Sequence, residues 1–307
     1  MPRLSIIVPY RNNDARLEMT LLSVLENRPQ DCEIIVVHSG TYANPYELDD
    51  EVIFVEEERR ANTAQLLNAG VMAACSPTVC ILLDGAVVTA DWSNAAIDQL
   101  LQSNMAAVAA SVRYFNSKLP SCGIDTHLMR HIQSARSGRL ETTRESDACA
   151  GPALACGLYR RKVLLAVGGW NVAVDESMVD VELAMTLKGI GLECRYEPDL
   201  NATMTCGSST RKLSTSAMSQ LSSLFVAHGA VSSSWFSTLR NFASDCLKGR
   251  LLTAAAWSAG VRDTNSIRKS QLRLNHAKQQ LGGAAESSTL PIHNDLPTRA
   301  RVARRAA

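Results

Sequence analysis

Residues 4–13 read LSIIVPYRNN, and this stretch decides the fold. Its first five residues form an apolar run rich in β-branched side chains, which Pro9 ends. Such a run is typical of a strand that is buried on both faces. Two asparagines and an aspartate follow at 12–14, and these are good helix N-caps. Apolar side chains then recur at helical spacing over residues 17–25, so the segment predicts a strand, a polar loop and an amphipathic helix in succession.

The same alternation continues outward from this segment. Further strands are expected at 33–37, 52–55, 79–83 and 106–112, and further helices at 63–74 and 92–102. Strands that alternate with helices predict an α/β fold with a doubly wound, mostly parallel sheet and helices on both faces. Ligands of such sheets bind outside the carboxyl ends of the strands. The loops at 9–12, 38–40 and 84–86 are therefore the first places to look for a site.

The pattern becomes less regular in the second half of the chain. Residues 115–150 are polar and irregular, and we expect them to form a segment over the site. Helices are predicted at 160–167 and 175–188, and a short strand at 194–196. Apolar side chains at helical spacing over 236–247 predict a further helix. It either packs on the main domain or lies on a membrane surface.

The composition excludes several classes of protein. The chain has 307 residues, of which 46% are hydrophobic, which argues against wholesale disorder. It carries 31 basic and 30 acidic residues, and a net charge of +1 predicts no nucleic-acid partner. Residues 262–307 hold nine Lys or Arg and three Asp or Glu, a net +6. This basic tail is either a solvated, flexible end or a contact for an anionic membrane surface.

The nine cysteines predict the compartment. Their number is odd, no CxxC spacing occurs, and several lie inside apolar runs, as Cys80 does. This favours reduced core thiols in a cytosolic protein over a disulfide or zinc framework. The chain opens without the hydrophobic region of a signal peptide and has no apolar stretch of about 18 residues. We expect no membrane-spanning helix and a cytoplasmic location, with peripheral contact at the inner face of the membrane through the basic C-terminal region.

Two acidic residues are candidates for chemistry. Asp84 follows an apolar strand and precedes Gly85 at the mouth of the predicted sheet. A carboxylate there binds a ribose hydroxyl or a metal ion that bridges a diphosphate, or it merely caps an ordinary Asp-Gly turn. Asp180 lies in a mostly apolar helical stretch. It serves either as a general base for an acceptor hydroxyl or as a structural acid in a first helical turn.

Three basic or titratable residues are weaker candidates. Arg160 and Arg161 begin a predicted helix and either pair with phosphate or lie in solvent. His38 ends a strand and either contacts a base or sugar or is structural. The chain has no GxGxxG, GxxxxGK[ST], GxSxG or HExxH motif. This argues against classical dinucleotide-binding, P-loop, α/β-hydrolase and zinc-protease sites.

Several segments taken together resemble family 2 glycosyltransferases with the GT-A fold. Residues 4–12 correspond to the family's first strand and nucleotide loop, 21–25 to its SL.SVL helix, and 33–37 to its second strand. Residues 68–70 correspond to the RN.G helix and 82–84 to the strand leading into DxD. Residues 151–170 correspond to the RR..l..vGGf region and 179–198 to the ED.dL.lRl...G segment, all in the family's order and spacing. The resemblance covers roughly residues 3–205.

The resemblance implies transfer of a sugar from a nucleotide-diphosphate donor to an acceptor hydroxyl. Nucleotide-sugar-binding residues would be Pro9, Tyr10, Arg11, Asn12, His38, Asn68 and Asp84. Asp180 matches the Asp of the ED pair and would be the catalytic base. The acceptor and phosphate side would hold Arg160, Arg161 and Trp170. A metal ion, Mn²⁺ or Mg²⁺, would lie beside Asp84.

The chain departs from the family pattern at several charged positions. The Asp-Asp after the second strand is His38-Ser39, the second Asp of DxD is Ala86, the arginine before Asn68 is Leu67, the Glu of ED is Val179, and the late histidine is Thr205 or Cys206. These changes leave Asp84 as the one expected metal ligand. Either arginine and lysine neutralise the diphosphate without a tightly bound cation, or the fold is kept while catalysis is lost.

Three parts of the chain are predicted. Residues 1–205 form a GT-A-like domain, 206–260 a helical extension and 261–307 a basic, flexible tail. The expected function is glycosyl transfer in the synthesis of surface polysaccharide or another glycoconjugate. Its partners would be a nucleotide-diphospho-sugar and a glycan or lipid-linked acceptor. The alternative is a catalytically inactive nucleotide- or glycan-binding protein on the same fold.

Overall fold

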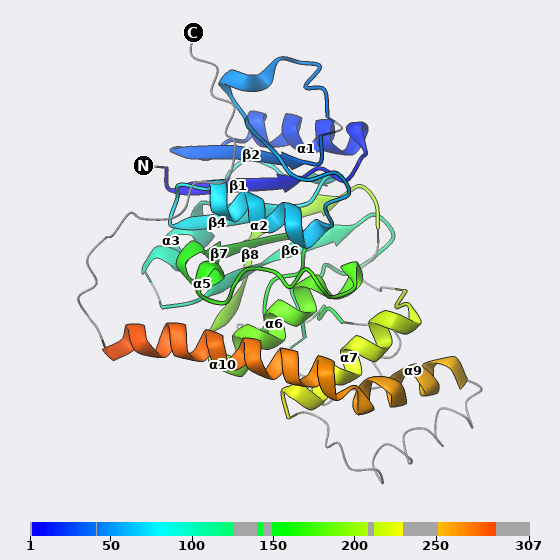
Figure 1. Cartoon of the computed structure of the whole chain (residues 1–307). Coiled ribbons are helices and arrows are strands. Elements are labelled where there is room, and N and C mark those ends of the chain that lie inside the picture. The colour runs from blue at the N-terminus through cyan, green and yellow to red at the C-terminus, as the bar shows by residue number, and fades with distance from the viewer. Residues whose placement is uncertain are drawn as a thin grey trace.

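The fold is built on an eight-stranded sheet (Figure 1). The computed structural model describes residues 2–40, 42–102, 104–125, 140–143, 149–207, 212–229 and 251–286. The strands are β1 (Leu4–Pro9), β2 (Cys32–His38), β3 (Ile53–Glu56), β4 (Thr78–Leu82), β5 (Ala86–Val87), β6 (Ala107–Tyr114), β7 (Cys156–Arg160) and β8 (Cys194–Met204). Across the sheet they lie in the order β3-β2-β1-β4-β7-β6-β8-β5.

Helices cover both faces of the sheet. They are α1 (Asp14–Glu26), α2 (Thr63–Ala73), α3 (Asn94–Gln102), α5 (Arg161–Ala166), α6 (Val179–Ile190), α7 (Thr215–Ala227), α9 (Leu251–Arg262) and α10 (Thr264–Glu286), with 3₁₀ turns η1 (Leu48–Asp50) and η2 (Glu176–Met178). The β1–α1–β2 and β3–α2–β4 crossovers run in opposite directions across the sheet. Because such crossovers are right-handed, α1 and α2 lie on opposite faces. The predicted doubly wound α/β sheet is confirmed, and α2 and α5 face the viewer in Figure 1.

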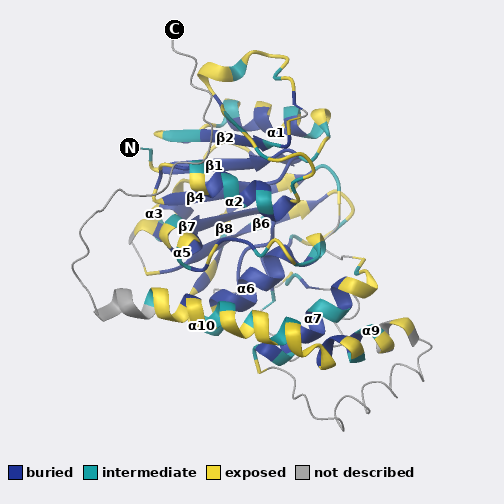
Figure 2. Ribbon diagram, viewed as in Figure 1, coloured by how far each residue is buried: buried dark blue, intermediate teal, exposed yellow. Residues whose placement is uncertain are grey.

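The apolar runs of the sequence form the centre of the sheet. Every residue of β1 and β4 is buried, and β1 pairs in parallel with β2 on one side and β4 on the other. In Figure 2 β1 is dark blue along its length. The helix α2 packs closely on them because Gly70 lacks a side chain: a Cβ there would lie 2.4 Å from Cγ2 of Ile7. The core thus sits between the sheet and the helices on either face.

Asparagine side chains determine where the first two helices begin. The side chain of Asn13 accepts a hydrogen bond from the main-chain N–H of Arg16 at the start of α1. Asn62 and Gln65 form a reciprocal capping box at the start of α2. Each cap contributes about 1 kcal/mol. The cap at Asn13 confirms the expected helix start and confines the loop after β1 to residues 10–13.

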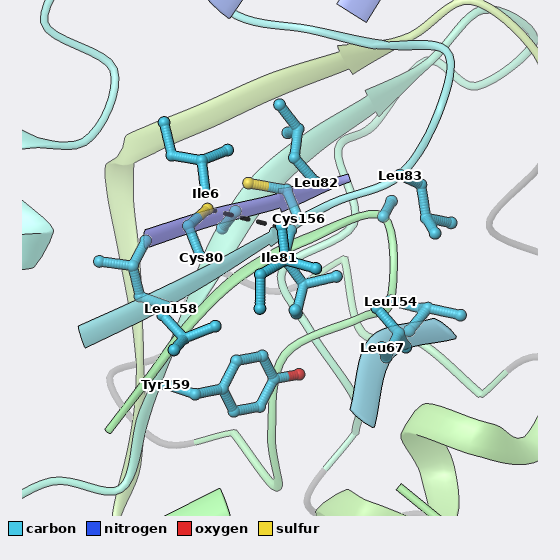
Figure 3. Packing of buried hydrophobic residues seen from close by; sticks show 14 of the residues in the cluster. Ile6, Leu67, Cys80, Ile81, Leu82, Leu83, Leu154, Cys156, Leu158 and Tyr159 are labelled. Atoms are coloured by element: carbon cyan, nitrogen blue, oxygen red, sulfur yellow. Dashed lines mark hydrogen bonds between the residues drawn. The ribbon is translucent and has the colours of Figure 1, made fainter. Parts of the chain in front are cut away.

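The antiparallel strand β7 departs from the expected sheet. The sequence shows only a small, apolar stretch at 151–159, yet Cys156–Arg160 pairs antiparallel with both β4 and β6. The stretch is poor in β-branched residues, so propensity does not mark it as a strand. Figure 3 shows how β4 and β7 pack, with Cys80, Ile81, Cys156 and Leu158 drawn together. Five cysteines of the described residues are buried, and none of those described is in a disulfide.

The strand β8 is much longer than the short strand expected at 194–196. It runs on to Met204 and pairs in parallel with β6, with a register shift between Ala110 and Ser111. The shift falls where β8 carries Pro198, which has no N–H to donate to the ladder. The irregular pairing therefore allows the strand to continue past the proline. Its far end lies beside β5, next to the loop that follows β4.

Beyond the sheet, α6, α7 and α9 enclose a second apolar cluster. Its large members include Met178, Val181, Phe225 and Trp257. The Phe225 and Trp257 rings meet edge to face with centroids 5.6 Å apart. The long helix α10 crosses beneath α6 and α7 (Figure 1). No helix among the described residues combines the length and hydrophobicity needed to cross a bilayer.

The expectation of a flexible tail from residue 261 is wrong for Thr264–Glu286, which forms α10. The helix is polar on average, which hides it from a search for apolar periodicity. The helix packs against α5, α6 and α7. Ala277 is fully buried there, and Arg273 pairs with a buried acid of α6. Many of its residues are exposed, as the yellow parts of the α10 ribbon in Figure 2 show. The helix predicted at 236–247 and residues 287–307 lie outside the described residues.

Candidate active site

A cavity of about 290 Å³ lies at the carboxyl ends of β1 and β4. It is lined by Arg11, Arg16, Leu83, Tyr114, Glu141, Leu154, Ala155, Glu176, Ser177, Met204, Cys206 and Gly207. These residues come from seven separate stretches of the chain, which the fold brings together at the carboxyl ends of the strands. The location is the one expected for a ligand of a doubly wound sheet.

The deepest charged group at this edge is Asp84, which directly follows β4 and Leu83. Its side chain is fully buried, and Oδ1 accepts hydrogen bonds from Arg11: Nε lies at 2.6 Å and Nη2 at 2.5 Å. Its second oxygen, Oδ2, is buried and has no hydrogen-bond partner among the described residues. Arg11 is 30% exposed and forms part of the cavity wall. A buried carboxylate is therefore held beneath a guanidinium that borders the cavity.

The turn after Asp84 is tightly anchored. Gly85 has φ of +90°, which favours glycine, and its N–H donates to the main-chain oxygen of Arg16 and to Oγ1 of Thr20. From the other side, both the N–H and the Oγ1 of Thr205 donate to the carbonyl of Gly85. A Cβ on Gly85 would lie 3.5 Å from Cγ of Arg16 and from Sγ of Cys206. The aspartate is thus placed by α1 and by the end of β8 together.

The loop after β1 contributes unequally to the site. Pro9 and Tyr10 are buried, and the Tyr10 hydroxyl donates to Asp14 at 2.6 Å. Asn12 has φ of 60° and is exposed. The left-handed backbone at Asn12 reverses the chain before the Asn13 cap, which leaves Arg11 as the loop's side chain on the cavity.

Aromatic side chains gather beyond β1, β2 and β3. The Tyr42 ring stacks on Phe54 with centroids 5.7 Å apart, and it lies 5.3 Å from Tyr10. His38 meets both Tyr42 and Phe54 edge-on, and its Nδ1 accepts from the N–H of Gly40. Burial lowers the pKa of His38, against a weaker opposing effect of Glu56. The buried Tyr42 hydroxyl has no partner among the described residues. Sequence reasoning did not single out Tyr42 or Phe54.

Asp180 lies behind the cavity wall. It is 1% exposed, its Oδ2 accepts from the N–H of Leu154 at 2.8 Å, and its Oδ1 accepts from the N–H of Val181 at 2.9 Å. Leu154 itself lines the cavity. In this arrangement the Asp180 carboxylate holds the main chain of the wall.

Two other carboxylates face the cavity and were missed as site residues. Glu176, in η2, is exposed and accepts a hydrogen bond from Oγ1 of Thr63. Glu141 accepts from the Tyr114 hydroxyl at 3.5 Å. The available signal for Glu176 was its place just before the acidic start of α6. Nothing local marks Glu141, because its neighbours in sequence are far from any motif.

Comparison with known proteins identifies the fold and the family. The sequence model described as glycosyl transferase family 2 matches residues 5–168, more than half of the chain. The chain belongs to glycosyl transferase family 2. No curated protein sequence matches it significantly. The predicted membership and the GT-A fold are both confirmed.

Two solved structures are similar to this glycosyltransferase. One is the mannosyltransferase PcManGT from Pyrobaculum calidifontis in complex with GDP-Man and Mn²⁺, with 20% identity, a TM-score of 0.51, and coverage of 94% of this chain and 77% of that chain. The other is GalNAc-T7 with UDP, GalNAc and Mn²⁺, with 13% identity, a TM-score of 0.60, and coverage of 92% of this chain and 56% of that chain. At these identities the likeness shows the fold.

Arg160 and Arg161, which were expected on the acceptor side, do not line the cavity. The antiparallel register places Arg160 opposite Thr78, the first residue of β4. Asp84 follows the other end of that strand. The Arg160 guanidinium donates to the main-chain oxygens of Met105 and Leu100. Arg161 donates to the oxygen of Val71. Because β7 runs antiparallel to β4, Arg160 and Arg161 lie at the amino-terminal end of β4. There they bind main-chain oxygens of α3 and α2.

Asn68 and Trp170, which were expected on the donor and acceptor sides, form hydrogen bonds with each other. The Asn68 Oδ1 accepts from the Trp170 N–H, and its Nδ2 donates to the Trp170 carbonyl, both at 2.8 Å. The Trp170 side chain is 1% exposed and packs edge-on against Tyr159. Neither residue lines the cavity. In this glycosyltransferase they join α2 to the glycine turn after α5.

The residues around Asp84 do not fit a divalent metal ion well. The described residues contain no group of three or more His, Cys, Asp or Glu side chains that could hold one. The second DxD position is Ala86, which is fully buried in β5. The position of the late histidine offers Thr205, whose hydroxyl donates to Gly85, and Cys206, whose thiol suits softer metals. One carboxylate oxygen of Asp84 is already held by Arg11.

Proposed function

We propose that this glycosyltransferase moves a sugar from a nucleotide-diphosphate donor to an acceptor hydroxyl in the cavity beside Asp84. The observation that carries the proposal is the buried, half-satisfied Asp84 carboxylate under Arg11 at the carboxyl end of β4. A buried carboxylate oxygen without a partner is costly unless a ligand supplies one. A hydroxyl of the donor would do so.

The donor's nucleoside would lie toward the aromatic cluster beyond β1 and β2. Tyr10, His38, Tyr42 and Phe54 form a cluster of packed rings, in which burial lowers the pKa of His38. Aromatic rings and the Tyr42 hydroxyl, which has no partner among the residues the structure describes, suit a planar base that carries polar edges. The diphosphate would then fall at Arg11, between this cluster and the acceptor end of the cavity. Asn12 and Pro9 shape the loop that carries Arg11.

The acceptor side requires a carboxylate that can take up a proton. Glu176 is exposed on the cavity wall, whereas both Asp180 oxygens accept main-chain hydrogen bonds behind it. We therefore place the general base at Glu176, and Asp180 becomes the residue that positions the Leu154 wall. As the acceptor oxygen bonds to the anomeric carbon, its proton passes to Glu176. The bond to the diphosphate breaks, and its electron pair leaves with the diphosphate oxygen.

The biological role we propose is synthesis of surface polysaccharide or another glycoconjugate on the cytoplasmic side. A glycan or lipid-linked acceptor would meet the enzyme at the inner face of the membrane. Membership of glycosyl transferase family 2 supports the reaction. The excess of basic residues over 262–307 supports contact with an anionic surface. A domain boundary near residue 205 fits the end of β8, because the described elements after β8 are all helices.

A thermal-shift panel tests the proposed function first. UDP-, GDP-, dTDP- and CDP-sugars would be added to the full chain at saturating concentration. A donor at a hundred times its dissociation constant stabilises the fold by about 2.7 kcal/mol, so the cognate nucleotide will stand out. Release of nucleoside diphosphate is then measured with monosaccharide and polyprenyl-phosphate acceptors. Acceptor-dependent release establishes transfer, and binding without release with any of them supports the inactive, binding alternative.

A further inference from the structure

We propose that the guanidinium groups of Arg11 and Arg16 replace a divalent cation at the donor diphosphate, so that donor binding and transfer need no metal. The inference rests on the proposed glycosyl transfer. It begins with the ion pair between Arg11 and Asp84, which occupies the place of a metal contact at the first DxD position. A cation that bound Oδ1 of Asp84 would first have to displace Nε and Nη2 of Arg11, at 2.6 and 2.5 Å.

The ligand count also argues against a resident cation. Mg²⁺ and Mn²⁺ prefer oxygen ligands in a near-octahedral shell of about six, with carboxylates as their charged protein anchors. At the Asp84–Gly85 turn the one side-chain oxygen left for a cation is Oδ2 of Asp84, since Ala86 has no side-chain ligand atom and the Thr205 hydroxyl donates to Gly85. The carboxylates of Glu141 and Glu176 line the same cavity, but the described residues contain no group of three such side chains that could hold a metal ion. Arg11 already neutralises the Asp84 carboxylate. A divalent ion would therefore lack the charged anchors that normally retain it.

The arginines supply the missing positive charge at the right place. A guanidinium has five N–H donors, and Arg11 directs two of its nitrogens at Asp84, which leaves further donors for phosphate oxygens. Arg16 lines the same cavity, and its Cγ would lie 3.5 Å from a Cβ on Gly85. Among the described residues Arg16 forms no ion pair. Two cations thus flank one buried anion at the Asp84–Gly85 turn, for a net charge of +1.

The cavity lining also carries two carboxylates, which keep their negative charge and belong to the acceptor side of the proposed site. The carboxylates of Glu141 and Glu176 accept hydrogen bonds from the hydroxyls of Tyr114 and Thr63. Asp84 in this scheme orients Arg11 through Oδ1 and meets a donor hydroxyl through Oδ2, but it does not contact the diphosphate. When the bond from the anomeric carbon to the diphosphate breaks, the charge that develops on the leaving oxygen is stabilised by the arginine N–H donors. The acceptor's proton goes to Glu176, so charge and atoms balance.

The decisive measurement uses the wild-type full chain. Dissociation constants for UDP, GDP, UDP-GalNAc and GDP-mannose are measured by calorimetry after metal removal, once with EDTA and once with Mn²⁺. We expect the nucleotide that binds best to show dissociation constants within about twofold of each other in the two conditions, because arginine charge is independent of metal. Transfer by the wild-type chain should be equally insensitive to EDTA.

Variants assign the effect to the two arginines. Arg11→Gln should weaken binding of the best nucleotide by about 10- to 100-fold, the size of a lost charge-assisted hydrogen bond to phosphate. Arg11→Lys keeps the charge and should recover part of this loss. Arg16→Gln leaves the Arg11–Asp84 pair intact, so it reports on phosphate binding even if Arg11→Gln folds poorly. Arg195→Gln is the matched control, since Arg195 pairs with exposed Glu193 away from the cavity.

The possible outcomes distinguish failure of the arginine proposal from failure of the proposed glycosyl transfer. Nucleotide binding that is lost in EDTA and restored by Mn²⁺ would overturn the arginine proposal and leave glycosyl transfer standing. Binding unchanged in both Arg11→Gln and Arg16→Gln would also overturn it. If no nucleotide or nucleotide sugar binds under either condition, the proposed function itself fails. Metal-independent binding that falls in both arginine variants and not in Arg195→Gln supports the proposal.

Discussion

The guanidinium of Arg273, on α10, lies 3.0 Å from the carboxylate of Glu182, on α6. Glu182 is 1% exposed and Arg273 18%, so the pair is almost removed from water. Burial raises the pKa of Glu182, and Arg273 opposes that rise. Arg273 also donates to the carbonyl of Gly169. The C-terminal helix is thereby tied to the helix that follows Glu176 and to the turn held by Asn68.

Breaking the Arg273–Glu182 pair should destabilise the protein strongly. Arg273→Gln leaves the Glu182 charge buried without its cation, which we expect to cost about 3 kcal/mol of unfolding free energy. The double variant Arg273→Gln with Glu182→Gln should lose less than the sum of the single changes, because no unpaired charge remains. Urea denaturation measures each value. Arg268→Gln, an exposed change on the same helix, is the control. A loss no larger than that of Arg268→Gln would show that the pair adds nothing to stability.

His228, at the end of α7, should make stability depend on pH. Burial, and then Lys278, lower its pKa from 6.5 to about 4. The unfolded chain thus binds a proton at a higher pH than the folded chain does. The stabilising contribution is complete above 6.5 and is lost as the pH falls toward 4. Urea denaturation at about pH 7.5 and about pH 5 should show a smaller drop for His228→Gln than for wild type.

The matched control for that experiment is His276→Gln, since His276 is an exposed histidine of α10. It should keep the wild-type drop in stability. His38 also has a lowered pKa, so part of the drop should survive in His228→Gln. Identical pH dependence in wild type and His228→Gln would refute the assignment.

The two candidate bases should respond differently to loss of charge. Glu176→Gln should lower kcat by about 10²- to 10⁴-fold, the usual contribution of a general base, with donor affinity unchanged. Asp180→Asn should instead lower stability by about 1–3 kcal/mol, because one of the N–H groups of Leu154 and Val181 loses its acceptor. Glu51→Gln, an exposed change, is the control. If Asp180→Asn abolishes transfer in a folded protein while Glu176→Gln retains it, Asp180 is the base.

The Asn68 clamp on Trp170 should be structural. Asn68→Ala removes two hydrogen bonds of 2.8 Å and should lower the free energy of unfolding by about 2 kcal/mol. Asn94→Ala removes an exposed side chain at the start of α3 and should cost much less. Nucleotide affinity of the folded Asn68→Ala protein should match wild type. A selective loss of affinity without a loss of stability would restore Asn68 to the donor site.

Local sequence patterns accounted for much of the architecture. The apolar runs over residues 4–8, 33–37 and 79–83 became β1, β2 and β4, and Asn13 caps α1 as its position indicates. These features depend on side chains a few residues apart, so a short window contains the relevant information. For the same reason the position of Asp84 at the carboxyl edge of the sheet followed from the strand before it.

Only the tertiary structure decided how the charged side chains pair. Arg11 and Asp84 are 73 residues apart in sequence, and Arg273 meets Glu182 across an even longer separation. Because β7 is antiparallel, Arg160 lies at the amino-terminal end of β4, away from Asp84. The 3₁₀ turn before α6 places Glu176 in the cavity lining. The sequence by itself determined the elements and their order, because hydrophobic periodicity and capping are local. Partners of buried charges are chosen by which elements pack together, and that choice depends on burial across the whole chain.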